Sequence, residues 1–173
     1  MTPVLRFRSK ILVNFRDYEF ESTGTHGFRW VNVKEFELLD ASAGPQAVLE
    51  SLIGDVAFRD DYSGGGIDAD GERHGPYWLR RVQPSSFEHV SAGRAVDVLD
   101  GWANKYGRIP ASLRDEIDRT VLGPIKRSDV CYLLTELDDS AIHDYGRIQI
   151  DFYEFVAVHY LSKEVHLIVA ADD

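Results

Sequence analysis

The sequence predicts an α+β fold, with a largely antiparallel sheet of about five to seven strands and two or three helices packed on one face. Three observations support this prediction. Extended, alternating segments open the chain, helical apolar stripes fill its middle, and further extended segments end it. We therefore expect a single domain over residues 1–173, with a flexible, acidic, glycine-rich loop at about residues 59–75.

The first segment, residues 3–20, alternates apolar residues with basic or polar ones. This period of two predicts a strand with a break or a hairpin inside it. The residues expected to share one face are Leu5, Phe7, Ile11, Val13 and Phe15. Turn-forming residues at 22–27 and a second extended segment at 28–40 then predict an antiparallel meander.

A short helix is expected within residues 42–54. Pro45 suits its first turn, because a helix leaves the first backbone N–H groups unbonded in any case. Gly54 suits its end.

Two further helices are expected after the glycine-rich loop. Residues 85–106 repeat apolar side chains at three- and four-residue spacing, with Ser85 or Ser86 as the N-cap. Residues 112–122 carry a second stripe, with Ser112 as the N-cap and a Gly-Pro pair as the stop. Their short connection predicts an αα-hairpin laid over the sheet.

The chain ends in strands. Residues 129–137 read as a buried strand, and residues 147–173 as a hairpin inside the sheet, with Glu154 marking a possible bulge. If the hairpin turn is Ser162-Lys163 alone, His159 and His166 face each other directly across it. Because no third ligand lies near them in the sequence, a structural pair is favoured over a metal site.

Charge is unevenly distributed. The net charge is −10, and residues 129–173 hold ten acids against two bases. Such a field repels nucleic-acid phosphates and attracts basic partners. We therefore expect a basic protein partner and no nucleic acid.

Cys131, the one cysteine, lies in an apolar run and is expected to be a buried thiol of a reducing compartment. The N-terminus lacks the apolar core of a signal peptide, and no window approaches 18 uncharged apolar residues. The sequence therefore predicts a cytoplasmic protein without membrane contact.

The glycine-rich loop partly matches a calcium loop. Asp68, Asp70 and Gly71 align with its third, fifth and sixth positions, but Gly66 and Tyr77 occupy the first and last ligand positions. A phosphate cradle is disfavoured too, because the loop is acidic and opens no clear helix. The composition instead favours a solvated acidic loop that returns to the core at the Tyr-Trp pair after it.

A second acidic segment, residues 136–146, joins two predicted strands. Asp139 and His143 would share a face if it were helical, as in a metal site or an acid–base pair. The pattern reads better as an acidic connector. Nucleophile elbows, HExxH, Walker loops and dinucleotide fingerprints are absent from the sequence, so we expect no catalytic residues, no metal and no cofactor.

These features predict a non-catalytic acidic protein that binds and neutralises a basic partner, as an immunity protein does with a bacterial toxin domain. One alternative is a metal-assisted hydrolase that uses His143, His159, His166 and nearby carboxylates. Another is an acidic mimic of nucleic acid. The residues expected to contact the partner are Asp60, Asp61, Asp68, Asp70, Glu72, Tyr77, Trp78, Asp138, Asp139, Asp144 and Tyr145.

Overall fold

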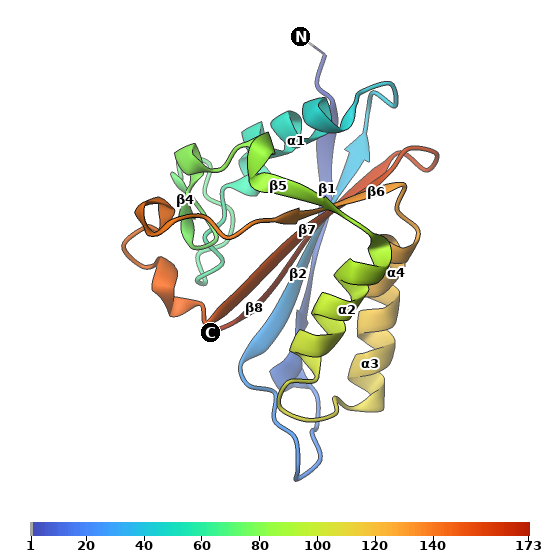
Figure 1. Ribbon diagram of the computed structural model, residues 1–173, viewed down its shortest axis with the longest axis vertical. Helices are drawn as coiled ribbons and strands as arrows, with labels where there is room; N and C mark the ends of the chain where they lie inside the picture. The colour runs from blue at the N-terminus through green and yellow to red at the C-terminus, as the bar shows by residue number, and fades with distance from the viewer. Residues whose placement is uncertain (1) are drawn as a thin grey trace.

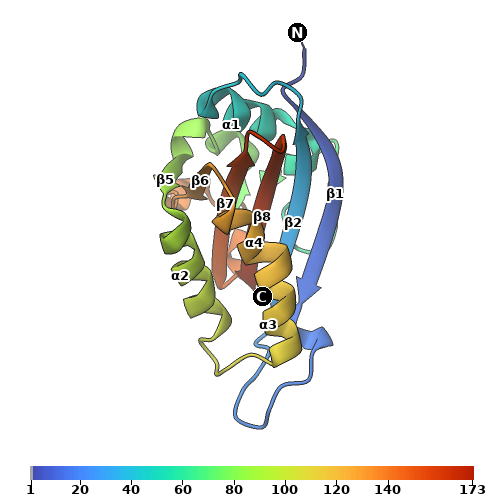
Figure 2. The ribbon, with the colours of Figure 1, turned by 90° about the vertical axis from the view of Figure 1, so that its right-hand side faces the viewer.

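The computed structural model describes residues 2–173, and within them the strands form one six-stranded sheet and one two-stranded sheet. All pairings are antiparallel, and the strands of the large sheet (Figure 1) have the order β1-β2-β8-β7-β6-β5, which can be followed in Figure 2. The strands are β1 (Leu5–Asn14), β2 (Arg29–Leu38), β3 (Arg73–His74), β4 (Tyr77–Trp78), β5 (Phe87–Val90), β6 (Val130–Leu134), β7 (Asp151–His159) and β8 (Glu164–Asp172). The predicted α+β class is confirmed.

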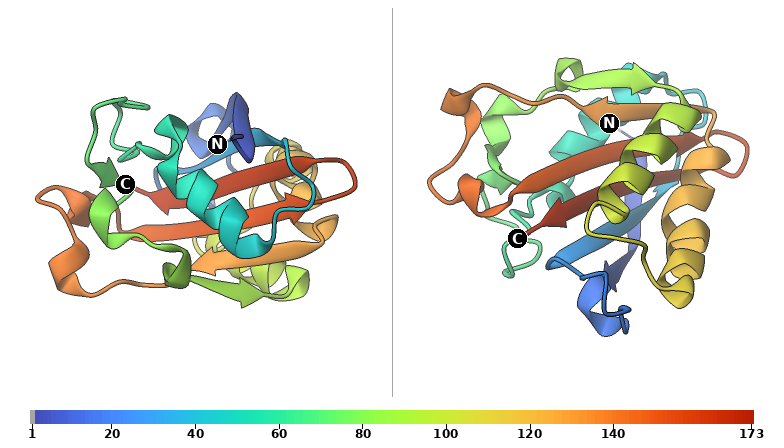
Figure 3. Two further views of the ribbon diagram at one scale, coloured as in Figure 1. Left: turned by 90° about the horizontal axis from the view of Figure 1, so that it is seen from above. Right: turned by 60° about the horizontal axis from the view of Figure 1, so that its bottom comes forward.

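The helices cover both faces of the large sheet. The helices are α1 (Pro45–Gly54), α2 (Ala92–Ala103), α3 (Ala111–Ile117) and α4 (Gly123–Lys126). We call the side covered by α2, α3 and α4 the helical face, and Figure 2 shows these helices in front of the strands. The opposite side, which we call the loop face, is covered by α1 and the segment that follows it (Figure 3). The two helical segments expected after the glycine loop thus share one face as predicted, whereas α1, the third expected helix, covers the opposite face.

A bulge in β1 divides its apolar residues between the two faces. The register of β1 against β2 shifts between Phe7 and Ser9. Leu5 therefore packs on the loop face with α1, whereas Val13 packs on the helical face with α2. The prediction that both share one face was wrong, because the extra residue of a bulge reverses the alternation beyond it.

The helix α2 is shorter than its apolar pattern predicted. Residues 87–90 form β5, which pairs with residues 131–134 of β6, and the helix begins only after Ser91. The Ser91 side chain caps it by accepting a hydrogen bond from the Arg94 N–H at 3.1 Å. The predicted N-cap at Ser85 or Ser86 was therefore wrong, because the residues expected in the first helical turn pair with β6 instead.

The next helix begins and ends differently from its prediction. Its N-cap is Pro110 instead of Ser112, and α3 passes through a π-helical turn, residues 118–122, into α4. The Gly-Pro pair does not stop the helix. Pro124 lies in the first turn of α4, where its missing N–H costs little.

The C-terminal hairpin lies inside the sheet, as expected, with β8 between β2 and β7. Its turn spans residues 160–163, so His159 pairs with Glu164 and not with His166. The direct opposition of the two histidines was therefore wrong. They are diagonal neighbours on the helical face, and their ring centroids lie 5.2 Å apart.

Cys131 is buried as expected, and burial raises the pKa of its thiol to about 12. None of the helices within residues 2–173 is long and apolar enough to cross a membrane.

Candidate functional site

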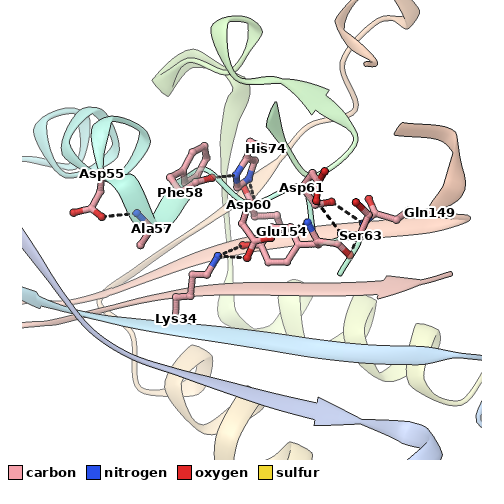
Figure 4. Close-up of polar contacts among 11 residues, drawn as sticks. Lys34, Asp55, Ala57, Phe58, Asp60, Asp61, Ser63, His74, Gln149 and Glu154 are labelled. Atoms are coloured by element: carbon pink, nitrogen blue, oxygen red, sulfur yellow. Dashed lines mark hydrogen bonds and ion pairs between the residues drawn. The ribbon is translucent and has the colours of Figure 1, made fainter. Parts of the chain in front are cut away.

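The glycine-rich segment, which we call the glycine loop (residues 59–75), starts from a buried ion pair. Lys34 of β2 donates to Asp60 Oδ2 at 2.8 Å, and both side chains are almost fully buried (Figure 4). Burial lowers the pKa of Lys34, and the neighbouring Asp60 carboxylate opposes that shift. Because an unpaired buried charge is very unfavourable, this contact holds the start of the loop against the sheet.

Tyr62 extends this contact. Its backbone N–H donates to Asp60 Oδ1 at 2.8 Å, and its hydroxyl accepts a hydrogen bond from Lys34 at 3.0 Å. Its backbone has a φ of 57°, in the left-handed region that side chains rarely adopt. Tyr62 also stacks on Trp30, with ring centroids 5.7 Å apart. These contacts hold the strained residue in place.

The end of the glycine loop is held by a second buried pair. His74 Nδ1 lies 2.6 Å from the Phe58 carbonyl oxygen, and His74 Nε2 is bonded to Glu154 of β7 (Figure 4). Because a carbonyl only accepts, Nδ1 carries a proton. Nε2 then either carries a second proton or accepts one from Glu154, so the pair holds a shared proton. The loop is thus attached to β2 at one end and to β7 at the other.

The acidic segment, which we call the connector (residues 135–150), packs against the end of the glycine loop. An isolated bridge joins Tyr77 to Ile142, and the His143 N–H donates to the Pro76 carbonyl at 3.1 Å. Gly146 lies against Pro76 so closely that a Cβ atom at this position would overlap its carbonyl group. Two segments separated by some 60 residues of sequence therefore form one surface.

His143 is fixed in one neutral form by its neighbours. Its Nδ1 accepts the Tyr145 N–H at 3.1 Å, so Nε2 must carry the proton that is donated to the Gly75 carbonyl at 2.7 Å. The ring is buried and also lies edge-on to Trp78. His143 is therefore a structural link between the two segments.

Arginine side chains lie over the aromatic residues of this surface. The Arg73 guanidinium is 5.1 Å from the Tyr145 ring centroid and 5.7 Å from that of Trp78. It also lies 3.8 Å from Asp61. Burial raises the pKa of Asp61, but hydrogen bonds from Ser63 together with nearby positive charge outweigh this, so the pKa lies below its usual value.

Nine of the predicted partner-binding residues lie at least partly exposed on the glycine loop, on β4 or on the connector. We call this set the acidic surface, and its members are Asp61, Asp68, Asp70, Glu72, Trp78, Asp138, Asp139, Asp144 and Tyr145. Asp60 and Tyr77 do not belong to it. Asp60 is 3% exposed and paired with Lys34, and Tyr77 is 7% exposed in the core.

Some of these carboxylates already have cationic neighbours. Arg81 lies 3.4 Å from Asp138, and Arg147 lies 3.4 Å from Asp139. A hydrogen bond from Ser140 lowers the pKa of Asp138. Within residues 2–173 no ion pair involves the other exposed acids of the surface: Asp68, Asp70, Glu72 and Asp144.

The histidines considered for a metal site do not all come together. His143 lies in the connector and is bonded to Gly75, whereas His159 lies at the end of β7 beside His166. Within residues 2–173, no three His, Cys, Asp or Glu side chains are grouped so that they could hold a metal ion.

Three buried residues of the site were missed by the sequence reading. Lys34 and Glu154 interrupt apolar strand patterns, and that interruption is the available signal. Glu154 is not a bulge as expected, because it stays in register opposite Val169 and points into the core toward His74. His74 carried no signal of its own.

Comparison with known proteins gave no match to a family model, a curated protein or a solved structure.

Proposed function

We propose that this protein is a non-catalytic binding protein that neutralises a basic protein partner, in the manner of an immunity protein that inhibits a toxin domain. The partner contacts the acidic surface. The observation that supports this proposal is the packing of the glycine loop against the connector, in which His143 bonds to Gly75 and Arg73 lies over Tyr145.

Charge supports the proposal in two ways. The chain carries a net charge of −10, and four exposed acids of the surface lie outside any ion pair within residues 2–173. Free carboxylates attract a basic protein over a distance and speed its association, with rates that fall as salt rises. The ion-paired acids contribute less to this attraction.

Pre-organisation supports it as well. Both ends of the glycine loop are attached to the sheet by buried pairs, at Asp60 and at His74. A surface held in its binding conformation loses less entropy when a partner docks. The half-buried Trp78 and the exposed Tyr145 then provide aromatic side chains of the kind that often dominate binding energy.

The test compares two variants of equal charge. In the first, Asp68→Asn, Asp70→Asn, Glu72→Gln and Asp144→Asn remove four charges from the acidic surface. In the matched control, Glu19→Gln, Glu21→Gln, Asp97→Asn and Asp115→Asn remove four exposed charges elsewhere. A basic protein captured at low salt is identified by mass spectrometry, and its association rate is measured by stopped flow across a salt series.

We expect the first variant to associate at least tenfold more slowly than wild type at low salt and to show a weaker salt dependence. The control should retain most of the wild-type rate. Equal slowing in both variants would mean that net charge alone matters, and the acidic surface would then not be the binding site.

A further inference from the structure

A groove separates the β1–β2 region of the loop face from the start of the glycine loop. It has a volume of about 460 Å³, and residues of β1 and β2 form one wall while residues of the loop form the other. Small-molecule sites in proteins have volumes of about 300–1,000 Å³. The groove is thus large enough for a small ligand.

The groove has a polar group without a partner. Asn32 of β2 lines it and is only 7% exposed. Within residues 2–173, its buried Oδ1 has no hydrogen-bond partner, which is unfavourable for an amide removed from water. A carboxamide presents a donor beside an acceptor, so it pairs with the edge of an amide or a lactam.

Two bases stand at the β1 side of the groove. Lys10 and Arg16 are exposed, and neither forms an ion pair within residues 2–173. Lys10 lies directly opposite Lys34 in the sheet, but the charge of Lys34 is already balanced by Asp60. Apart from that balanced pair, the lining holds two bases against the single acid Asp173, so it favours an anionic group.

Part of the remaining lining is apolar. Leu12 is 57% exposed and Ile148 is 54% exposed, so both offer apolar surface to the groove. Trp30 also lines the groove; it is 8% exposed and is stacked on the ring of Tyr62. A flat organic body would cover these surfaces and remove them from water.

The geometry points to a binding site for a small planar organic anion that carries an amide or lactam edge. The edge pairs with Asn32, the anionic group contacts Lys10 and Arg16, and the flat body packs on Leu12, Trp30 and Ile148. This site shares no member residue with the acidic surface, and it does not depend on a protein partner.

The test uses three small probes that differ in one feature each. Orotate has a planar lactam ring and a carboxylate, uracil has the ring without the carboxylate, and benzoate has a carboxylate without the lactam. Each is titrated into the ¹⁵N-labelled full chain, and the shifts of the Asn32 side-chain amide, the Trp30 indole and the Gly64 and Gly66 amides are followed. We expect orotate to shift these signals together and to bind at least tenfold more tightly than either other probe.

Variants separate the contributions. Lys10→Gln with Arg16→Gln should weaken orotate binding at least tenfold and leave uracil binding unchanged, because charged hydrogen bonds are lost only for the anion. The matched control, Arg94→Gln with Lys163→Gln, removes two exposed bases elsewhere and should have no effect. Three outcomes would overturn the inference: benzoate binding equal to that of orotate, equal weakening by the control, or no groove shift with any probe at about 10 mM, where even a site with a Kd of about 1 mM would be mostly occupied.

Discussion

Asp60 and Lys34 form an ion pair of 2.8 Å inside the core, although the sequence places Asp60 in an acidic loop and Lys34 in an apolar strand. At the far end of the glycine loop, the bonded pair of His74 and Glu154 forms a second attachment to the sheet. The glycine-loop carboxylates proposed to meet a partner lie between these two attachments. The buried pairs therefore matter for stability and for the shape of the acidic surface together.

Removing one member of the Lys34–Asp60 pair should destabilise the protein strongly. Asp60→Asn leaves the Lys34 charge buried without a counter-charge, and we expect a loss of about 3–5 kcal/mol in the free energy of unfolding. Lys34→Met should cost a similar amount. The double variant should lose less than the sum, because neither lone charge remains. Urea unfolding of all four proteins measures this, and additive losses would contradict a coupled pair.

Glu154→Gln should be tolerated better than Glu154→Leu. With Nδ1 donating to Phe58, a neutral His74 presents Nε2 as an acceptor, and the Gln amide can donate to it. We expect Glu154→Gln to cost about 1 kcal/mol or less. Glu154→Leu leaves Nε2 unpaired in the core and should cost about 2–3 kcal/mol. Equal losses in thermal or urea unfolding would show that the bond to His74 contributes little.

His166 should make the protein less stable in acid. Burial, followed by the neighbouring His159, lowers its pKa from 6.5 to about 4, and Glu164 opposes the shift. The Glu35 carboxylate lies 3.9 Å from His166 Nε2, and His166 Nδ1 has no hydrogen-bond partner within residues 2–173. Because folding favours the neutral ring, its contribution is complete above pH 6.5 and is lost as the pH falls through 4.

Between pH 6.5 and pH 4, protonation of His166 should lower the free energy of unfolding by about 3 kcal/mol. We expect His166→Phe to remove this part of the pH dependence, when unfolding is measured between pH 7 and pH 4. The exposed His89 serves as the control, since His89→Gln should keep the wild-type slope. Parallel curves for wild type and His166→Phe would rule out this origin.

Two glycine-to-alanine variants should have opposite effects. A Cβ atom at Gly146 would overlap the Pro76 carbonyl and lie 2.6 Å from the Ile142 Cγ2, so Gly146→Ala should cost about 1–3 kcal/mol. At Gly101, an exposed position of α2, a Cβ atom meets nothing within 4 Å. Gly101→Ala should therefore stabilise the protein by up to about 1 kcal/mol, since alanine favours the helix. A harmless Gly146→Ala would mean that the connector is not tightly packed there.

Local patterns in the sequence were sufficient for the fold class and for the apolar elements. The stripe of α2, the short helix at Pro45 and the C-terminal hairpin follow from spacing that a chain shows on its own. The first and last residues of these elements were less predictable. The first turn expected for α2 became β5, because pairing with β6 satisfied those backbone groups instead.

The candidate site depended more on tertiary structure. Sequence composition alone marked the acidic residues of the glycine loop and the connector, because a cluster of carboxylates can be recognised without knowing the fold. Only the folded chain placed the two segments side by side and withdrew Asp60 from the surface to meet Lys34. It also brought His74 to Glu154 across 80 residues. Sequence periodicity reports only on residues that are close along the chain. The partners of a buried charge depend on tertiary packing, which the arrangement of the whole sheet determines.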